Sequence, residues 1–95
     1  MMSTMDLSRL LKSVGQSTFV THYRQFADES LSNVEVADLL PKDLTEKSRR
    51  SRTTHARDIF SRGLEMEALE VIAASTRAGN EQTAEDARNL LADMR

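Results

Sequence analysis

The apolar residues of this chain fall into short helical stripes separated by polar or glycine-containing breaks. The first stripe occupies residues 6–14 and has the i, i+3, i+4, i+7 spacing of one helix face: Leu7, Leu10, Leu11 and Val14. Gly15 follows and predicts a left-handed helix end, because glycine adopts that conformation without steric cost. A second helix, capped by Ser17 or Thr18, is expected to continue to about Ala27.

The second helix carries three of the four aromatic residues of the chain in one stripe: Phe19, Tyr23 and Phe26. Aromatic stripes at helical spacing are ordinarily core, so we expect these rings to fill the centre of the domain. A third helix is expected to begin after Ser32, because Glu35 stands three residues later in the spacing of a capping box. Pro41 disfavours a helical Leu40 and therefore predicts the end of this helix.

Three further segments complete the pattern. A basic segment, residues 45–63, has Thr45 as its expected cap and Gly63 as its expected end. A helix over residues 64–75 has apolar side chains on two sides, which predicts two neighbours and raises the hypothesis of a homodimer. A last helix is expected from Glu81 or Thr83 to Met94. With no strand pattern of any strength, the sequence predicts one all-α domain (1–95) of five or six short helices.

Composition narrows the class of protein. The chain has no cysteine, which excludes a disulfide framework and a thiolate metal site. It has neither a secretory signal pattern nor a run of eighteen apolar residues, so we expect a cytoplasmic protein without a membrane partner. The two histidines, His22 and His55, lie far apart and lack metal-ligand spacing, and the three glycines form no phosphate loop. We therefore expect a non-enzymatic protein with no cofactor and no metal.

Charge is distributed unevenly. Between Thr45 and Arg62 six basic residues face two acidic ones, a local balance of +4 within a chain whose total is −2. A cationic segment on an otherwise acidic protein indicates an anionic partner. Arginine, which predominates here, grips phosphates and guanine edges through forked donors, and short hydroxyl side chains between the arginines reach phosphate oxygens. The predicted nucleic-acid-binding residues are Lys47, Arg49, Arg50, Ser51, Arg52, Thr53, Thr54, His55 and Arg57.

Residues 32–63 resemble a helix-turn-helix with an enlarged turn. In that arrangement the second helix enters the major groove by its N-terminal residues. Arg49 and Arg52 share the apolar stripe of Ala56, Ile59 and Phe60, and charges do not sit unpaired in a dry core. We therefore expect the basic helix either to project beyond the body or to begin only near Ser51 or Thr53. The second option would leave about a dozen residues after Leu40, where three or four are usual.

Two functions remain open at this point. The first is a small nucleic-acid-binding protein, with duplex DNA as the expected form and regulation as the expected role. The second is a helical adaptor or inhibitor whose basic segment meets the acidic surface of another protein. The low pI of about 5.6 favours the second, since many dedicated DNA-binding domains have a high pI.

Overall fold

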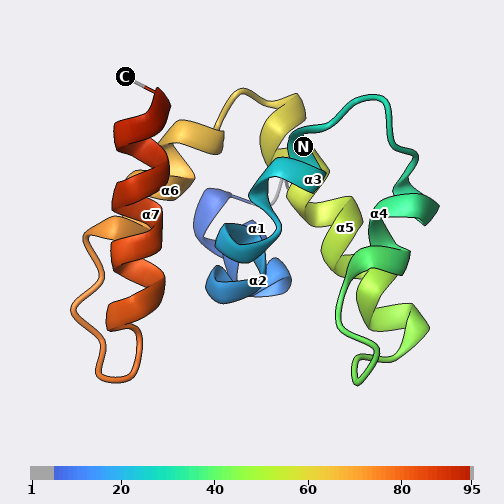
Figure 1. Cartoon of the computed structure of the whole chain (residues 1–95), viewed down its shortest axis with the longest axis horizontal. Coiled ribbons are helices and arrows are strands. Elements are labelled where there is room, and N and C mark those ends of the chain that lie inside the picture. The colour runs from blue at the N-terminus through green and yellow to red at the C-terminus, as the bar shows by residue number, and fades with distance from the viewer. Residues whose placement is uncertain (1–5, 95) are drawn as a thin grey trace, which may run out of the picture.

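A computed structural model describes residues 6–94, and seven helices without a strand make up this part of the chain (Figure 1). In chain order they are α1 (Leu7–Val14), α2 (Gln16–Thr21), α3 (Tyr23–Ala27), α4 (Asn33–Leu39), α5 (Glu46–Ser61), α6 (Glu65–Ala73) and α7 (Glu81–Met94). The all-α prediction is confirmed. The number is higher than expected because the second predicted helix is divided at His22.

The starts of α4 and α5 carry the side-chain caps that the sequence predicts. The expectation that Ser17 or Thr18 caps the second helix is wrong, because α2 already begins at Gln16, directly after Gly15, and has no side-chain cap. The capping box of α4 is complete, since Glu35 N–H donates to Ser32 Oγ at 3.2 Å and Ser32 N–H donates to Glu35 Oε1 at 2.9 Å. The last residue of α4 is Leu39, so Leu40, which precedes Pro41, lies outside the helix as predicted. Gly15 has a positive φ of 88° at the end of α1, but its ψ of 125° lies outside the left-handed helical region that we expected. Local rules therefore fix where α4 and α5 begin and where α4 ends.

The division between α2 and α3 was not predicted. His22 has φ −109° and ψ 22°, outside the helical range, and separates the two helices. The stripe of Phe19, Tyr23 and Phe26 continues across this break, and all three side chains are buried. Hydrophobic periodicity is therefore the same on both sides and gives no sign of the interruption.

The helices form two flanks around a central pair. α7 stands at one edge with α6 packed against it, and α4 lies beside α5 at the other edge (Figure 1). α1 packs on α5, and α2 contacts α7, so α1 and α2 occupy the middle. The final helix begins at Glu81, which settles the choice between Glu81 and Thr83. None of the helices in residues 6–94 is long and apolar enough to cross a membrane.

An aromatic cluster joins α5 to the N-terminal half. The Phe19 ring lies 5.6 Å from Tyr23 and 5.8 Å from Phe60, between ring centroids, and Tyr23 lies 5.0 Å from Phe60. Aromatic pairs at these separations add about 0.5–1.5 kcal/mol each to the burial of their surface. The prediction that the aromatic stripe is core is therefore confirmed, and this core holds one face of α5 in place.

The apolar side chains on the two sides of residues 64–75 pack largely against other helices of the same chain. Ala68, Leu69 and Ile72 are fully buried, while Met66 is half-buried and Val71 is 47 % exposed. α6 packs against α7 and also contacts α5. The pattern therefore needs no second subunit to account for it, and the homodimer stays a prediction.

Candidate nucleic-acid interface

The nine residues predicted to bind nucleic acid all lie on α5, which begins at Glu46. The Thr45 hydroxyl accepts a hydrogen bond from Ser48 N–H across 3.1 Å, as expected of an N-cap. The expectation that this helix projects from the body or begins only near Ser51 or Thr53 is wrong. α4 packs along α5, and each of the charged heads on its inner side donates to at least one carbonyl oxygen.

Four of the predicted residues are exposed on the side of α5 opposite its buried face: Lys47, Arg50, Ser51 and Thr54. On a helical wheel they span an arc of about 100°. We call this set the outward face of α5. Arg50 Nη2 lies 2.6 Å from Glu46 Oε1, one turn earlier, and both side chains are well exposed. Such a pair contributes only about 0–1 kcal/mol, so a bound anion can replace the carboxylate.

Arg49 turns back towards the connection before α5. Its Nη1 donates to the carbonyl oxygen of Leu44 across 2.6 Å, and its Nε is buried without an acceptor among the described residues. The side chain is half-buried. Arg49 therefore fastens the start of α5 to the preceding turn and does not stand on the outward face.

Arg52 joins α5 to the junction of α1 and α2. Its Nη1 donates to the Val14 carbonyl oxygen at 2.7 Å and to Thr18 Oγ1 at 3.1 Å. Its Nε donates to Ser48 Oγ at 3.1 Å. The Val14 carbonyl belongs to the last turn of α1, where carbonyl groups lack helical partners and attract cations. Arg52 thus supplies a donor to a helix-end carbonyl that has no N–H partner within its own helix.

Arg57 makes the corresponding contact with the end of α3. Its Nη2 donates to the Asp28 carbonyl oxygen at 3.0 Å and to the Gln25 carbonyl oxygen at 3.5 Å. Its Nε is buried without an acceptor in residues 6–94. Hydrogen bonds from Ser30 lower the pKa of the Asp28 carboxyl, with a smaller contribution from the charge of Arg57.

The two remaining predicted residues differ in accessibility. Thr53 is fully buried, and its Oγ1 donates to the Arg49 carbonyl oxygen at 2.9 Å within the helix. His55 is half-buried, with Nδ1 2.7 Å from the Ser51 carbonyl oxygen. Thr53 is therefore closed off from any ligand in this conformation, whereas His55 lies at the margin of the outward face.

The structure thus places seven of the nine predicted residues in two groups. Lys47, Arg50, Ser51 and Thr54 form the outward face, and three arginines reach inward to neighbouring segments: Arg49, Arg52 and Arg57. The inward acceptors are mainly carbonyl oxygens, and within residues 6–94 none of the three forms an ion pair with a carboxylate. Their positive charge is therefore not cancelled by direct partners and still contributes to the field around α5.

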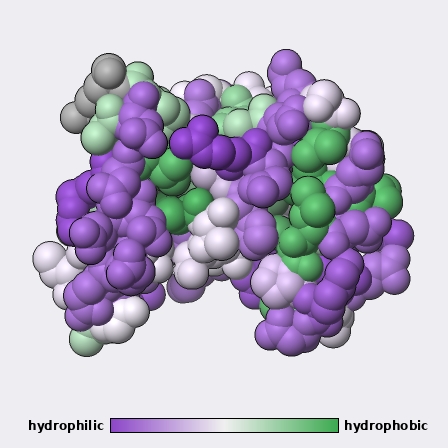
Figure 2. Space-filling view, in the orientation of Figure 1, coloured by the Kyte–Doolittle hydropathy of each residue, from purple (hydrophilic) through white to green (hydrophobic). Residues whose placement is uncertain are grey.

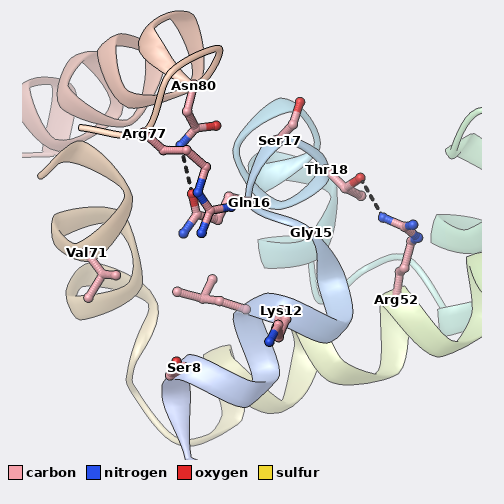
Figure 3. Close-up of a pocket in the computed structure, with 11 residues that line it drawn as sticks. Ser8, Lys12, Gly15, Gln16, Ser17, Thr18, Arg52, Val71, Arg77 and Asn80 are labelled. Carbon is pink, nitrogen blue, oxygen red and sulfur yellow. Dashed lines mark hydrogen bonds between the residues drawn. The ribbon is translucent and has the colours of Figure 1, made fainter. Parts of the chain in front are cut away.

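Two further cationic side chains, from outside α5, share a cavity with Arg52. The sequence pattern gives no reason to group them with α5. Lys12 on α1 and Arg77 after α6 line the same cavity as Arg52 (Figure 3). They are separated from each other by most of the chain, and neither belongs to a basic run. Only the packing of α1, α2 and α6 brings them together.

The other titratable side chains offer no second cluster of this kind. Burial lowers the pKa of His22, and burial together with the charge of Glu65 raises the pKa of Tyr23. Within residues 6–94 no group of three His, Asp or Glu side chains is placed to hold a metal ion. No protein-family model matches this sequence, and no curated protein or solved structure is detectably similar to it.

Proposed function

We propose that this protein binds nucleic acid, with duplex DNA as the expected form, through the outward face of α5. The proposal rests chiefly on the link between α4 and α5, which is only six residues long, residues 40–45. That length is close to the turn of a helix-turn-helix, whose second helix presents its N-terminal residues to the major groove. Lys47, Arg50 and Ser51 lie in the first half of α5, and Thr54 follows just past its midpoint.

The inward arginines support this role indirectly. Arg49, Arg52 and Arg57 hold α5 against the preceding turn, α1 and α3, which fixes the orientation of the outward face. A helix held in one orientation loses less conformational freedom on binding. Because these arginines lack carboxylate partners in the described part of the chain, they also raise the local positive potential that draws a polyanion towards α5.

A fluorescence-anisotropy titration of duplex DNA at low salt tests the proposal. We expect affinity to fall as salt rises, because binding releases counterions from the phosphates. The double variant Lys47→Ala/Arg50→Ala should lower the magnitude of the salt slope by about 2 and weaken binding to all sequences. The control Arg9→Ala/Arg24→Ala removes the same charge from exposed sites on α1 and α3 and should retain the wild-type slope.

A second change acts in the opposite direction. Glu46→Gln removes the carboxylate that holds Arg50, so we expect DNA to bind several-fold more tightly, with little change in stability. Equal affinity for the double variant and its control, or no binding at about 50 mM salt, would reject the proposal. If the protein binds single-stranded DNA or RNA but not duplex DNA, duplex DNA is rejected as the form of nucleic acid that it recognises.

The alternative is a protein partner, and one observation favours it. Val34 and Leu39 on α4 are 57 % and 53 % exposed, and hydrophobic surface is visible where α4 lies (Figure 2). Apolar side chains beside a basic helix are typical of a surface that docks on an acidic protein. A helical adaptor or inhibitor would leave duplex DNA unshifted and would co-purify with one stoichiometric protein.

A further inference from the structure

A cavity of about 470 Å³ lies between α1, α2, α6 and the connection after α6 (Figure 3). Three cations line it: Lys12, Arg52 and Arg77. No carboxylate does, although acidic residues outnumber basic ones in the whole chain, fifteen to thirteen. The lining is therefore selectively positive, which the composition of the protein does not explain.

The three cations keep donors that this fold does not use. Arg52 donates through Nε and Nη1, while Nη2 has no acceptor within residues 6–94. Lys12 and Arg77 take part in no ion pair in the same range. In Figure 3 the Arg77 side chain extends from the connection towards Gln16, and Lys12 rises from α1 below Gly15. The three cations therefore line the cavity from three different segments, and Arg52 lies across the turn of Gly15 and Thr18 from Arg77 (Figure 3).

Uncharged groups complete the lining. Hydroxyls come from Ser8, Ser17 and Thr18. Asn80 Nδ2 donates to Gln16 Oε1 at 2.9 Å, which leaves the Gln16 amide nitrogen available as a donor. On the opposite wall, Leu11 and the exposed side chain of Val71 are apolar. One part of the cavity therefore suits anionic oxygens and another suits carbon.

We propose that this cavity binds a small organic phosphate monoester. A phosphate dianion matches three cations without a carboxylate, and its oxygens accept from the hydroxyl and amide donors. The organic group lies against Leu11 and Val71. The volume is within the range of small-molecule sites, about 300–1,000 Å³. The site is separate from the outward face of α5, so it goes beyond the nucleic-acid function and does not depend on it.

The test is an NMR titration of the 15N-labelled full chain with inorganic phosphate and with phenyl phosphate, at constant ionic strength in chloride. We expect saturable shifts at the amides of residues 12–18 and 75–80. Phenyl phosphate should bind several-fold more tightly than inorganic phosphate, because its ring covers the apolar wall. Lys12→Ala and Arg77→Ala should each weaken binding about tenfold. Arg24→Ala, an exposed arginine outside the cavity, should leave it unchanged.

Several outcomes would overturn this proposal. Shifts that spread over the whole surface, or equal affinity in the Lys12→Ala/Arg77→Ala variant and in Arg24→Ala, would show that no built site exists. Displacement of phenyl phosphate by duplex DNA would assign the cavity to a backbone phosphate instead of a free small molecule. Phenyl phosphate binding that survives Lys47→Ala/Arg50→Ala supports the proposal, and it does so whether or not DNA binds.

Discussion

The guanidinium of Arg52 donates to the carbonyl oxygen of Val14 across 2.7 Å, although thirty-eight residues separate them in the chain. Gly15 makes this contact possible. A Cβ placed on Gly15 would lie only 2.8 Å from Arg52 Nη1, closer than side-chain carbons normally approach. The absence of a side chain at residue 15 therefore leaves room for the Arg52 guanidinium beside the Val14 carbonyl.

Replacing Gly15 with alanine should destabilise the protein by about 2 kcal/mol or more, because a positive φ and the contact with Arg52 both oppose a Cβ. Gly79→Ala is the matched control. Gly79 has a similar φ of 85° but no atom within 4 Å of the added carbon, so only backbone strain remains. Urea unfolding of both variants separates the two effects, and equal losses would show that the Arg52 contact is unimportant.

Arg52→Lys should lower the free energy of unfolding by about 1–3 kcal/mol. A lysine ammonium cannot reach the Val14 carbonyl, Thr18 Oγ1 and Ser48 Oγ together, as the planar guanidinium does. Arg50→Lys retains the same charge on the same helix at an exposed position and should change stability by less than about 0.5 kcal/mol. Thermal or urea denaturation compares them, and similar midpoints would contradict the anchoring role of Arg52.

Two adjacent threonines of α5, one exposed and one buried, allow a test of which hydroxyl contributes to DNA binding. Thr54→Val should weaken DNA binding, because the exposed hydroxyl of Thr54 lies on the outward face and can donate to phosphate. Thr53→Val should leave DNA affinity unchanged, because Thr53 is fully buried and bonded to the Arg49 carbonyl. Anisotropy titrations of the two variants supply the comparison. Equal loss of affinity would mean that α5 rearranges on binding.

The stability of the fold should rise with pH near neutrality because of His22. Burial lowers its pKa below the ordinary 6.5, so the unfolded chain binds a proton more readily than the folded one. Stability is then lost as the pH falls through about 6.5 towards the lower folded pKa. Urea unfolding at pH 7.5 and 5.5 should show this loss in the wild type and a smaller one in His22→Gln. If the loss of stability between pH 7.5 and 5.5 is the same in His22→Gln as in the wild type, His22 is not its cause.

Two carboxyl groups with lowered pKa values titrate at lower pH than His22, so they do not affect the comparison of pH 7.5 with pH 5.5. Hydrogen bonds from the backbone and side chain of Ser32 lower the pKa of Glu35, and those from Ser30 lower the pKa of Asp28. Their stabilising contacts are complete above their ordinary pKa values of 4.5 and 3.8. They are lost only as the pH falls further, through the depressed folded values.

Some helix boundaries were predictable because they depend on a few neighbouring residues. Ser32 with Glu35 and Thr45 with Ser48 behave as local spacing rules require, whereas the start of α2 at Gln16, without a side-chain cap, was not predicted. The break at His22 was not predictable, since the apolar stripe runs through it. Nothing in the local pattern distinguishes one continuous helix from two helices in line.

The binding residues were predictable only in part. The helical wheel placed Arg49 and Arg52 on the apolar stripe, but we expected both to be free to contact nucleic acid, and in the structure both turn inward. Their acceptors could not be found from the sequence, because the Val14 and Asp28 carbonyls come from distant segments and every residue has a carbonyl. Lys12 and Arg77 meet only through tertiary packing, so periodicity and charge runs could not group them.

The inward arginines have carbonyl oxygens as their principal acceptors, and a carbonyl has no proton to gain in mild acid. Ion pairs such as Arg50 with Glu46 are lost once the carboxylate is protonated, whereas the bonds from Arg52 to Val14 and from Arg57 to Asp28 keep both partners unchanged. The joints between α5 and its neighbours therefore keep their hydrogen bonds under acidic conditions that protonate the surface carboxylates.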